Sequence, residues 1–257
     1  MRVPVLSLEQ RWFAALLCYT LAPLGIVLAR RPRAIDFWWD FAMAIGICAV
    51  AGFALLPLVS ARWWAPRHRG TAFLRLVQAT HRELSYVLLV FTLAHAGLLW
   101  VLEPRIVEYL LPGAIAPMLA GTGALALGAF IVVSSRHREA LRWPYAGWRG
   151  WHAGLSCVLL GLLGWHVIGA GYHYPRTATQ GTLCMLAAVP TFATWWLRRH
   201  PGARGGRLAP AGRPVRAPRL VLAIALTWIA AAVGFGWSGA AQVPLEERAL
   251  CARDPCL

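Results

Sequence analysis

Long apolar runs alternate with short, arginine-rich connections along almost the whole chain. Seven of these runs are each about long enough to cross a hydrocarbon core of about 30 Å as a helix. They cover residues 12–29, 41–59, 72–102, 113–134, 150–171, 181–197 and 220–241. The pattern predicts an all-α, polytopic membrane helix bundle of about seven transmembrane helices, of which the sixth is the shortest.

The composition supports a membrane protein. The chain has 257 residues, of which 59% are hydrophobic, and its mean hydropathy of +0.56 is well above that of a soluble domain. Most tryptophans fall near the ends of the expected helices, where aromatic belts form in membrane proteins. These are Trp38, Trp39, Trp63, Trp64, Trp100, Trp143, Trp148, Trp195, Trp196 and Trp237.

The net charge of +15 comes from arginines in the connections, so it indicates topology rather than nucleic-acid binding. By the positive-inside rule, the connections after residues 59, 134 and 197 are cytoplasmic. We therefore expect a multi-pass protein of the inner (plasma) membrane, with its N-terminus cytoplasmic and its C-terminus outside, in the periplasm. Arg30, Arg31 and Arg33 oppose this orientation, because they follow the first helix on the expected outer side.

The predicted organisation has four parts. Residues 1–197 form a transmembrane domain, 198–219 an Arg/Pro/Gly-rich cytoplasmic linker, 220–241 an additional transmembrane helix and 242–257 a short outer tail. The first helix lacks a signal-cleavage pattern and is expected to remain in the mature protein. The stretch GTGALALG at 121–128 lies inside an apolar run rather than after a strand, so we interpret it as helix packing and expect no nucleotide domain.

Four histidines share one spacing inside two of the apolar runs. His81 and His95 are 95 − 81 = 14 residues apart, and His152 and His166 are 166 − 152 = 14 apart. At about 100° and 1.5 Å per residue, this interval returns to nearly the same helix face after a rise of about 21 Å. The two helices cross in the same direction, because a single helix separates them. His81 should therefore face His152 near the cytoplasmic side, and His95 should face His166 near the outer side.

Two facing pairs of imidazoles favour two b-type haems, each ligated from both faces and held between the third and fifth helices. A single zinc or copper ion is excluded for all four histidines, because two levels about 21 Å apart cannot share one ion. A lone histidine in a membrane helix more often bonds to a neighbouring helix, but two copies of one interval form a more specific signal. The other histidines are expected at surfaces: His68, His137, His173 and His200.

The segments HRELSYVLLVFTLAH and WRGWHAGLSCVLLGLLGWH resemble the ferric reductase-like transmembrane domain, which ferric reductases, NADPH oxidases and the bacterial haem subunit of the periplasmic methionine sulfoxide reductase system share. The resemblance covers roughly the second to sixth helices. It implies two haem b groups on His81, His95, His152 and His166, and it extends more loosely to Arg82 and Trp148. The flavin and nicotinamide module that many members carry has no counterpart in this chain.

These features predict a transmembrane electron-transfer protein that is a subunit of an oxidoreductase. Electrons would pass from a separate cytoplasmic flavoprotein or quinol, through the inner and then the outer haem, to an outer-side acceptor or a periplasmic partner protein. Two alternatives stay open: the haem subunit of a periplasmic methionine sulfoxide reductase system, and a non-haem transporter that uses the histidines for ions or protons. Arginine suits haem propionates, and the candidates are Arg75, Arg82 and Arg149 near the inner pair and Arg105 and Arg176 near the outer pair.

Overall fold

The computed structural model describes residues 8–29, 35–60, 71–170 and 218–240, and all regular structure within these ranges is helical. Six long helices are present there: α1 (Leu8–Ala29), α2 (Phe37–Ser60), α3 (Thr71–Leu102), α4 (Ala116–Arg136), α5 (Tyr145–Ala170) and α7 (Pro218–Ala240). A short 3₁₀ helix, η2 (Pro104–Leu110), connects α3 to α4. Each long helix is long and apolar enough to cross a membrane. The expected polytopic helical bundle is therefore confirmed in its class.

The expected sixth helix, 181–197, lies outside the described residues, as do most of the linker and the outer tail. The helices that are described match the apolar runs closely, with one informative difference. α5 begins at Tyr145, five residues before the apolar run that predicts it, because Pro144 precedes a first turn in which the Trp148 backbone N–H donates to the Pro144 carbonyl. The start of α5 therefore includes Trp148.

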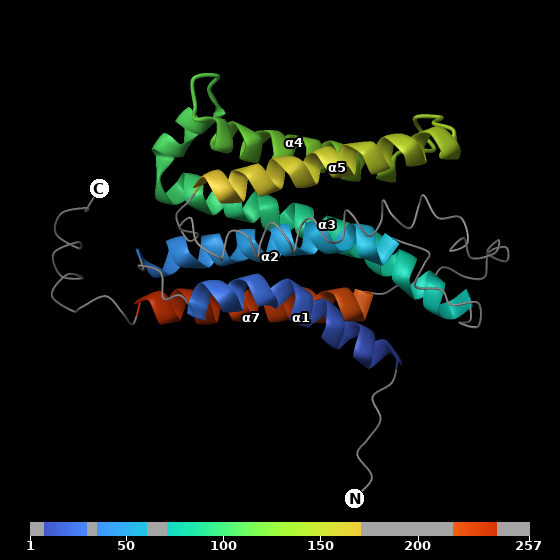
Figure 1. Ribbon diagram of the computed structural model, residues 1–257, viewed down its shortest axis with the longest axis horizontal. Helices are drawn as coiled ribbons and strands as arrows, with labels where there is room; N and C mark the ends of the chain where they lie inside the picture. Colours follow the sequence, from blue (N-terminus) through green and yellow to red (C-terminus); the bar gives the residue numbers. More distant parts are fainter. Residues whose placement is uncertain (1–7, 30–34, 61–70, 171–217, 241–257) are drawn as a thin grey trace, which may run out of the picture.

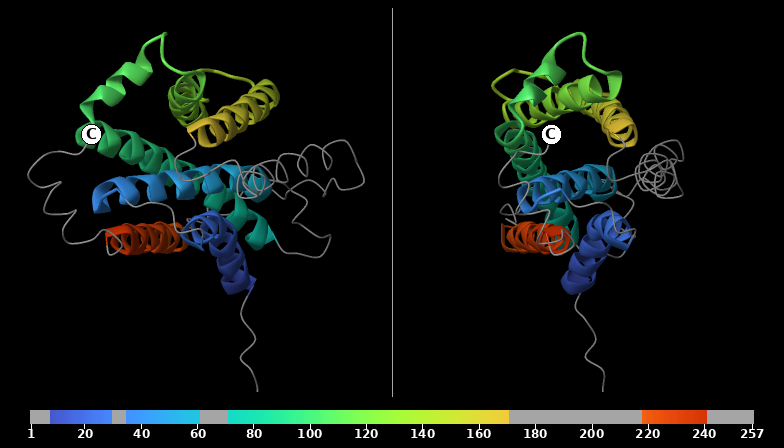
Figure 2. Two further views of the ribbon diagram at one scale, coloured as in Figure 1. Left: turned by 60° about the vertical axis from the view of Figure 1, so that its left-hand side comes forward. Right: turned by 90° about the vertical axis from the view of Figure 1, so that its left-hand side faces the viewer.

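The described helices lie in three groups, which Figures 1 and 2 show from different sides. α4 and α5 lie side by side on one side, α1 and α7 lie on the opposite side, and α2 and α3 lie between them. α2 is the central helix, because α1, α3 and α7 all pack against it. In its apolar span 67% of the residues are buried, compared with 17% in that of α5.

α7 is an integral part of this core. The Trp228 side chain is fully buried, and its Nε1–H donates to Thr20 Oγ1 of α1 at 2.9 Å. Its ring also meets Phe91 of α3 edge to face, with 5.6 Å between centroids. Gly52 of α2 permits this approach, since a Cβ there would collide with Leu88 and lie 3.0 Å from the Trp228 ring. α7, which the sequence predicts as an additional transmembrane helix, thus contacts α1, α2 and α3.

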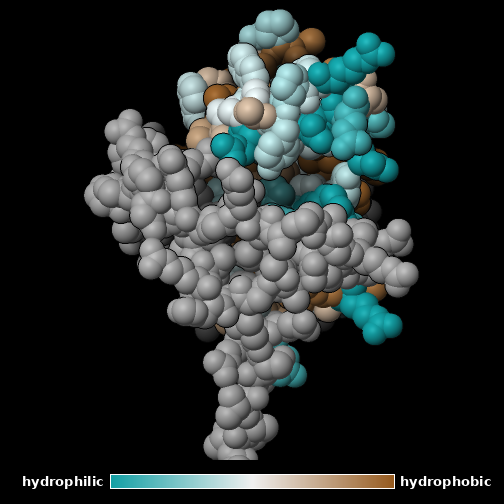
Figure 3. Space-filling view, turned by 90° about the vertical axis from the view of Figure 1, so that its right-hand side faces the viewer, coloured by the Kyte–Doolittle hydropathy of each residue, from teal (hydrophilic) through white to brown (hydrophobic). Residues whose placement is uncertain are grey.

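α3 and α5 run in the same direction, because α4 returns the chain between them (Figure 1). The ends of the bundle differ in character from its apolar sides. Figure 3 looks onto the end where α4 finishes and α5 begins, and hydrophilic residues gather over that connection. The exposed charged or polar residues there include Arg136, His137, Glu139, Arg142 and Arg149.

Candidate functional site

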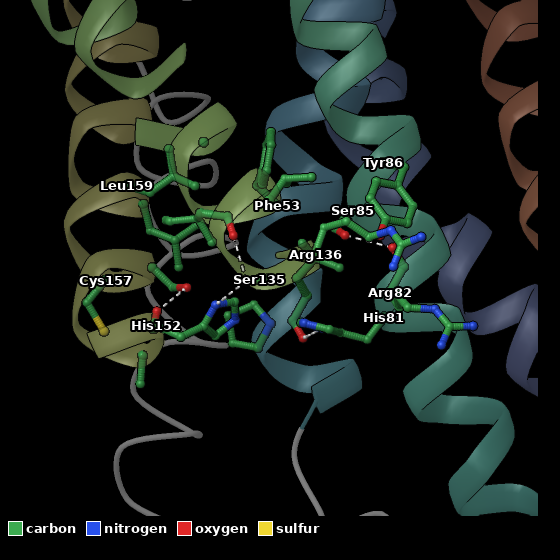
Figure 4. Close-up of a pocket in the computed structure, with 18 of the residues that line it drawn as sticks. Phe53, His81, Arg82, Ser85, Tyr86, Ser135, Arg136, His152, Cys157 and Leu159 are labelled. Atoms are coloured by element: carbon green, nitrogen blue, oxygen red, sulfur yellow. Dashed lines mark hydrogen bonds between the residues drawn. The ribbon is translucent and has the colours of Figure 1, made fainter. Parts of the chain in front are cut away.

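The structure brings His81 of α3 and His152 of α5 together. Their ring centroids are 6.2 Å apart, with 68° between the ring planes, and the two side chains meet at one end of a cavity between the helices (Figure 4). Both residues are only partly exposed. Since α3 packs mainly on α2 and α5 mainly on α4, the pair spans the boundary between two helical hairpins, α2–α3 and α4–α5.

Three of the four histidines donate a hydrogen bond to a backbone carbonyl of a neighbouring helix. Nδ1 of His81 lies 3.2 Å from the Leu56 oxygen, Nδ1 of His95 lies 2.8 Å from the Ala42 oxygen, and Nδ1 of His166 lies 2.9 Å from the Pro117 oxygen. A carbonyl oxygen only accepts, so Nδ1 must carry the hydrogen. The neutral ring then has its lone pair on Nε2, the atom that can bind a metal.

The His152 ring also carries its hydrogen on Nδ1, but the acceptor is a side-chain hydroxyl. Its Nδ1 lies 3.3 Å from Ser135 Oγ, while that hydroxyl donates to the Ile131 carbonyl at 2.6 Å. A hydroxyl has one hydrogen to donate, so Ser135 Oγ accepts from His152 Nδ1–H. All four rings therefore carry their Nδ1 hydrogen toward an acceptor of the neighbouring helix, which fixes one tautomer in each.

Two glycines make room for the outer histidines. A Cβ on Gly46 would lie 2.7 Å from Nδ1 of His95, and a Cβ on Gly121 would lie 2.6 Å from Nδ1 of His166. Each glycine stands four residues after the carbonyl that the ring bonds, one helical turn away. The missing side chain exposes that carbonyl to the ring. GTGALALG, which begins at Gly121, thus contributes to helix packing at a histidine.

The outer pair also lies across the two hairpins. His95 belongs to α3 and His166 to α5. Their hydrogen-bond acceptors lie in the first half of α2 and at the start of α4. The outer histidines therefore lie on the same two helices as the inner pair, 14 residues further along each helix.

A cavity of about 410 Å³ adjoins the inner pair, within the size range of ligand pockets. Its wall comes from α2, α3, α4 and α5, and it includes both inner histidines and Ser135. The Trp148 ring lies 4.9 Å from that of His152 at a tilt of 31° and also lines the cavity. Arg136 lines it from the end of α4.

The arginines expected near haem propionates have different positions. Arg82 lines the cavity, but its guanidinium pairs with the neighbouring Glu83 carboxylate at 2.9 Å, and its side chain is half exposed. Arg149 is exposed, and the backbone N–H of Arg105 is capped by the Glu103 side chain. The Arg75 side chain and Arg176 lie outside the described part of the chain.

Sequence reasoning missed four contributors: Gly46, Gly121, Ser135 and Arg136. A glycine or serine inside an apolar helix is common, so its type alone carries little signal. The combination of a histidine, a carbonyl and a glycine carries a usable signal. Each outer histidine contacts a glycine, and this glycine stands four residues after the residue whose carbonyl accepts the hydrogen bond from the histidine. Finding it requires knowing which helices are neighbours.

The geometry of the inner pair can be compared with that of two histidines that ligate one iron. Among the described residues no group of three or more His, Cys, Asp or Glu side chains could hold a metal ion. In a haem the macrocycle supplies four ligands, and two histidines complete the coordination of the iron. When two histidines bind one metal from opposite sides, each metal–nitrogen bond is about 2 Å long, and the centre of each ring lies about 1 Å beyond its nitrogen. The two ring centroids are then about 6 Å apart. The 6.2 Å between His81 and His152 fits this requirement.

Comparison of the chain with protein-family models, with curated proteins and with solved structures gave no match.

Proposed function

We propose that this protein is a transmembrane di-haem b electron-transfer protein. One observation carries the proposal: four intramembrane histidines, in two pairs across α3 and α5, each direct Nδ1–H to an acceptor on the adjacent helix and so keep Nε2 for coordination. Histidine ligands in metalloproteins are oriented by this kind of bond. The resemblance to the ferric reductase-like transmembrane domain points to the same cofactor.

The histidines would bind one haem at each level: His81 with His152 at the inner level and His95 with His166 at the outer level. When bound, each haem supplies a one-electron couple between ferric and ferrous iron. With two histidines on each iron no open coordination position remains, so a substrate would not bind the metal and transfer would be outer-sphere.

The other residues of the bundle orient the ligands and exclude water. Between the two levels, Leu88 of α3 and Leu159 of α5 are buried and belong to the apolar core. Such a low-dielectric interior strengthens the effect of each ligand hydrogen bond. At the inner level Arg136 and Arg82 line the cavity, where a guanidinium could pair with a carboxylate such as a haem propionate.

The donor is proposed to be a separate cytoplasmic flavoprotein or quinol. The acceptor is proposed to be an outer-side compound or a periplasmic partner protein. This direction rests on the arginine-rich connections, which the positive-inside rule places in the cytoplasm. Four arginines, at positions 136, 138, 142 and 149, lie in the connection between α4 and α5 and in the helix ends beside it, at the same end as the inner pair.

The first experiment is purification in detergent, followed by oxidised and dithionite-reduced absorption spectra with haem quantified per chain. Two low-spin b haems per chain are expected. A folded preparation from haem-replete cells without haem would contradict the proposal.

A second candidate function, proton or ion transport, is favoured by Asp40. This residue of α2 is 1% exposed, and neither of its carboxylate oxygens has a hydrogen-bond partner. An ionisable group inside a membrane helix often marks an ion or proton pathway. Transport predicts that Asp40→Asn stops proton uptake into liposomes that contain the purified protein, measured with a pH-sensitive dye. Electron transfer alone predicts no such uptake in the wild type.

A further inference from the structure

The two hairpins correspond position by position. Pro117 follows Ala42 by 117 − 42 = 75 residues, and Gly121 follows Gly46 by 121 − 46 = 75. These are the carbonyl and glycine partners of His166 and His95. The α4–α5 hairpin therefore repeats the arrangement of the α2–α3 hairpin at the outer level.

The histidine helices repeat in the same way. His152 follows His81 by 152 − 81 = 71 residues, and His166 follows His95 by 166 − 95 = 71. When the segments 81–95 and 152–166 are aligned, they are identical at both histidines and at the residues LS and VLL, which lie between the histidines. Because these offsets are constant, the acceptor of a histidine in the α2–α3 hairpin predicts the acceptor of the equivalent histidine in the α4–α5 hairpin. The predicted acceptor is the residue of α4 that lies 75 positions after the one in α2.

At the inner level, the described acceptor of His152 differs from the carbonyl that the repeat predicts. His81 bonds the Leu56 carbonyl, and 56 + 75 = 131 identifies Ile131 as the carbonyl expected for His152. Instead, the Ser135 hydroxyl lies between them, accepting from His152 at 3.3 Å and donating to Ile131 at 2.6 Å. Among the side chains that the structure describes, the Ser135 hydroxyl thus takes the place of the carbonyl as an acceptor at His152. Ser135 also lines the inner cavity.

We propose that Ser135 is a positioning residue that sets the orientation and basicity of His152 and thereby the midpoint potential of the inner haem. This inference rests on the proposed function. The acceptor of a ligand histidine raises the basicity of the coordinating nitrogen, which stabilises the ferric state. Because the hydroxyl is held by the Ile131 carbonyl, its lone pairs face the histidine, and removing it leaves Nδ1–H without this acceptor.

The test compares Ser135→Ala with Ser134→Ala by redox titration of the purified haem-loaded protein, followed by absorption and EPR spectroscopy. Ser134 is a matched control, because its hydroxyl also donates to the Ile131 carbonyl, at 3.3 Å, and is buried next to Ser135. We expect Ser135→Ala to shift the inner haem to a more positive potential and to change its EPR g values. The outer haem, and both haems of Ser134→Ala, should keep their wild-type values.

Ser135→Thr retains the hydroxyl and should restore the wild-type potential. If Ser135→Ala releases the inner haem while Ser135→Thr retains it, the inference is also supported, since the hydroxyl is then needed to hold His152. Unchanged potentials in Ser135→Ala would overturn it. Equal shifts of both haems, or the same shift in Ser134→Ala, would overturn it too, because the effect would then come from α4 packing. Absence of haem from the wild type would instead refute the proposed function.

Discussion

The α2–α3 and α4–α5 hairpins hold their histidines by nearly the same bonds in very different surroundings. In the apolar span of α2 67% of residues are buried, because α1 and α7 cover it, whereas in α4 the share is 28%. Yet His95 and His166 each rest on a glycine and bond a carbonyl one turn before it. The orientation of each histidine ring is therefore set within its own hairpin, and the other helices stabilise the assembly.

The largest effects should follow removal of a histidine. Because each proposed haem takes one ligand from each hairpin, His81→Ala and His152→Ala should both lose the inner haem. His95→Ala and His166→Ala should both lose the outer one. Haem per chain, with the spectrum of the remaining haem, measures this.

His137→Ala, at an exposed position after α4, is the control and should keep both haems. If His81→Ala and His95→Ala affected the same haem, the ligands would pair within a hairpin and the comparison would fail.

A second test uses the unequal covering of the hairpins. Trp228→Ala removes a fully buried ring and its bond to Thr20, so the free energy of unfolding should fall by about 3–5 kcal/mol. Thermal or denaturant unfolding in detergent measures this change. Leu226→Ala, on an exposed face of the same helix, should have a much smaller effect. Equal losses in the two variants would show that α7 does not anchor the α2–α3 hairpin.

A third test asks whether the two glycines are equivalent. In Gly46→Ala and Gly121→Ala the new Cβ would collide with the Nδ1 side of His95 and His166, so each should weaken retention of the outer haem by about 10–100-fold. Haem dissociation to an apo-acceptor protein measures the effect. Gly97→Ala and Gly164→Ala, where a Cβ meets nothing within 4 Å, should retain haem normally. If only one of the two variants weakened haem retention, the two glycines would not be equivalent.

The smallest effect should come from the ion pair that directly follows the first histidine of α3. Arg82 and Glu83 follow His81, whereas Ala153 and Gly154 follow His152. The pair is substantially exposed, so Glu83→Gln should change the free energy of unfolding by no more than about 1 kcal/mol. Denaturant titration in detergent checks this, with Glu139→Gln as the control for a second exposed pair. A larger loss would show that the α3 half depends on this charge.

The helices were predictable because hydrophobic runs of membrane length are a strong signal. α2, α3, α4, α5 and α7 begin and end within about five residues of their apolar runs. The 14-residue interval likewise predicted which histidines could face one another, since helix geometry fixes depth and direction from spacing alone. The haem assignment itself stays a prediction.

The acceptors of the histidines were not predictable from spacing. His95 and Ala42 are 53 residues apart, and backbone carbonyls have the same chemistry at every position. The bond between Ser135 and His152 was equally unpredictable. A serine near a helix end usually bonds the backbone of its own helix, as Ser135 also does. For the same reason Asp40 could not be recognised as unpartnered before the packing around α2 was known.

The sequence by itself determined the helical class, the apolar helices that match its runs and the spacing of the four histidines along their helices, because each of these follows from local periodicity and hydrophobicity. Only the tertiary structure decided that α2 is central, that α7 joins the core through Trp228, and that glycines and a serine on adjacent helices orient the rings. These depend on which helices pack together, and close packing selects partners by shape across residues far apart in the chain.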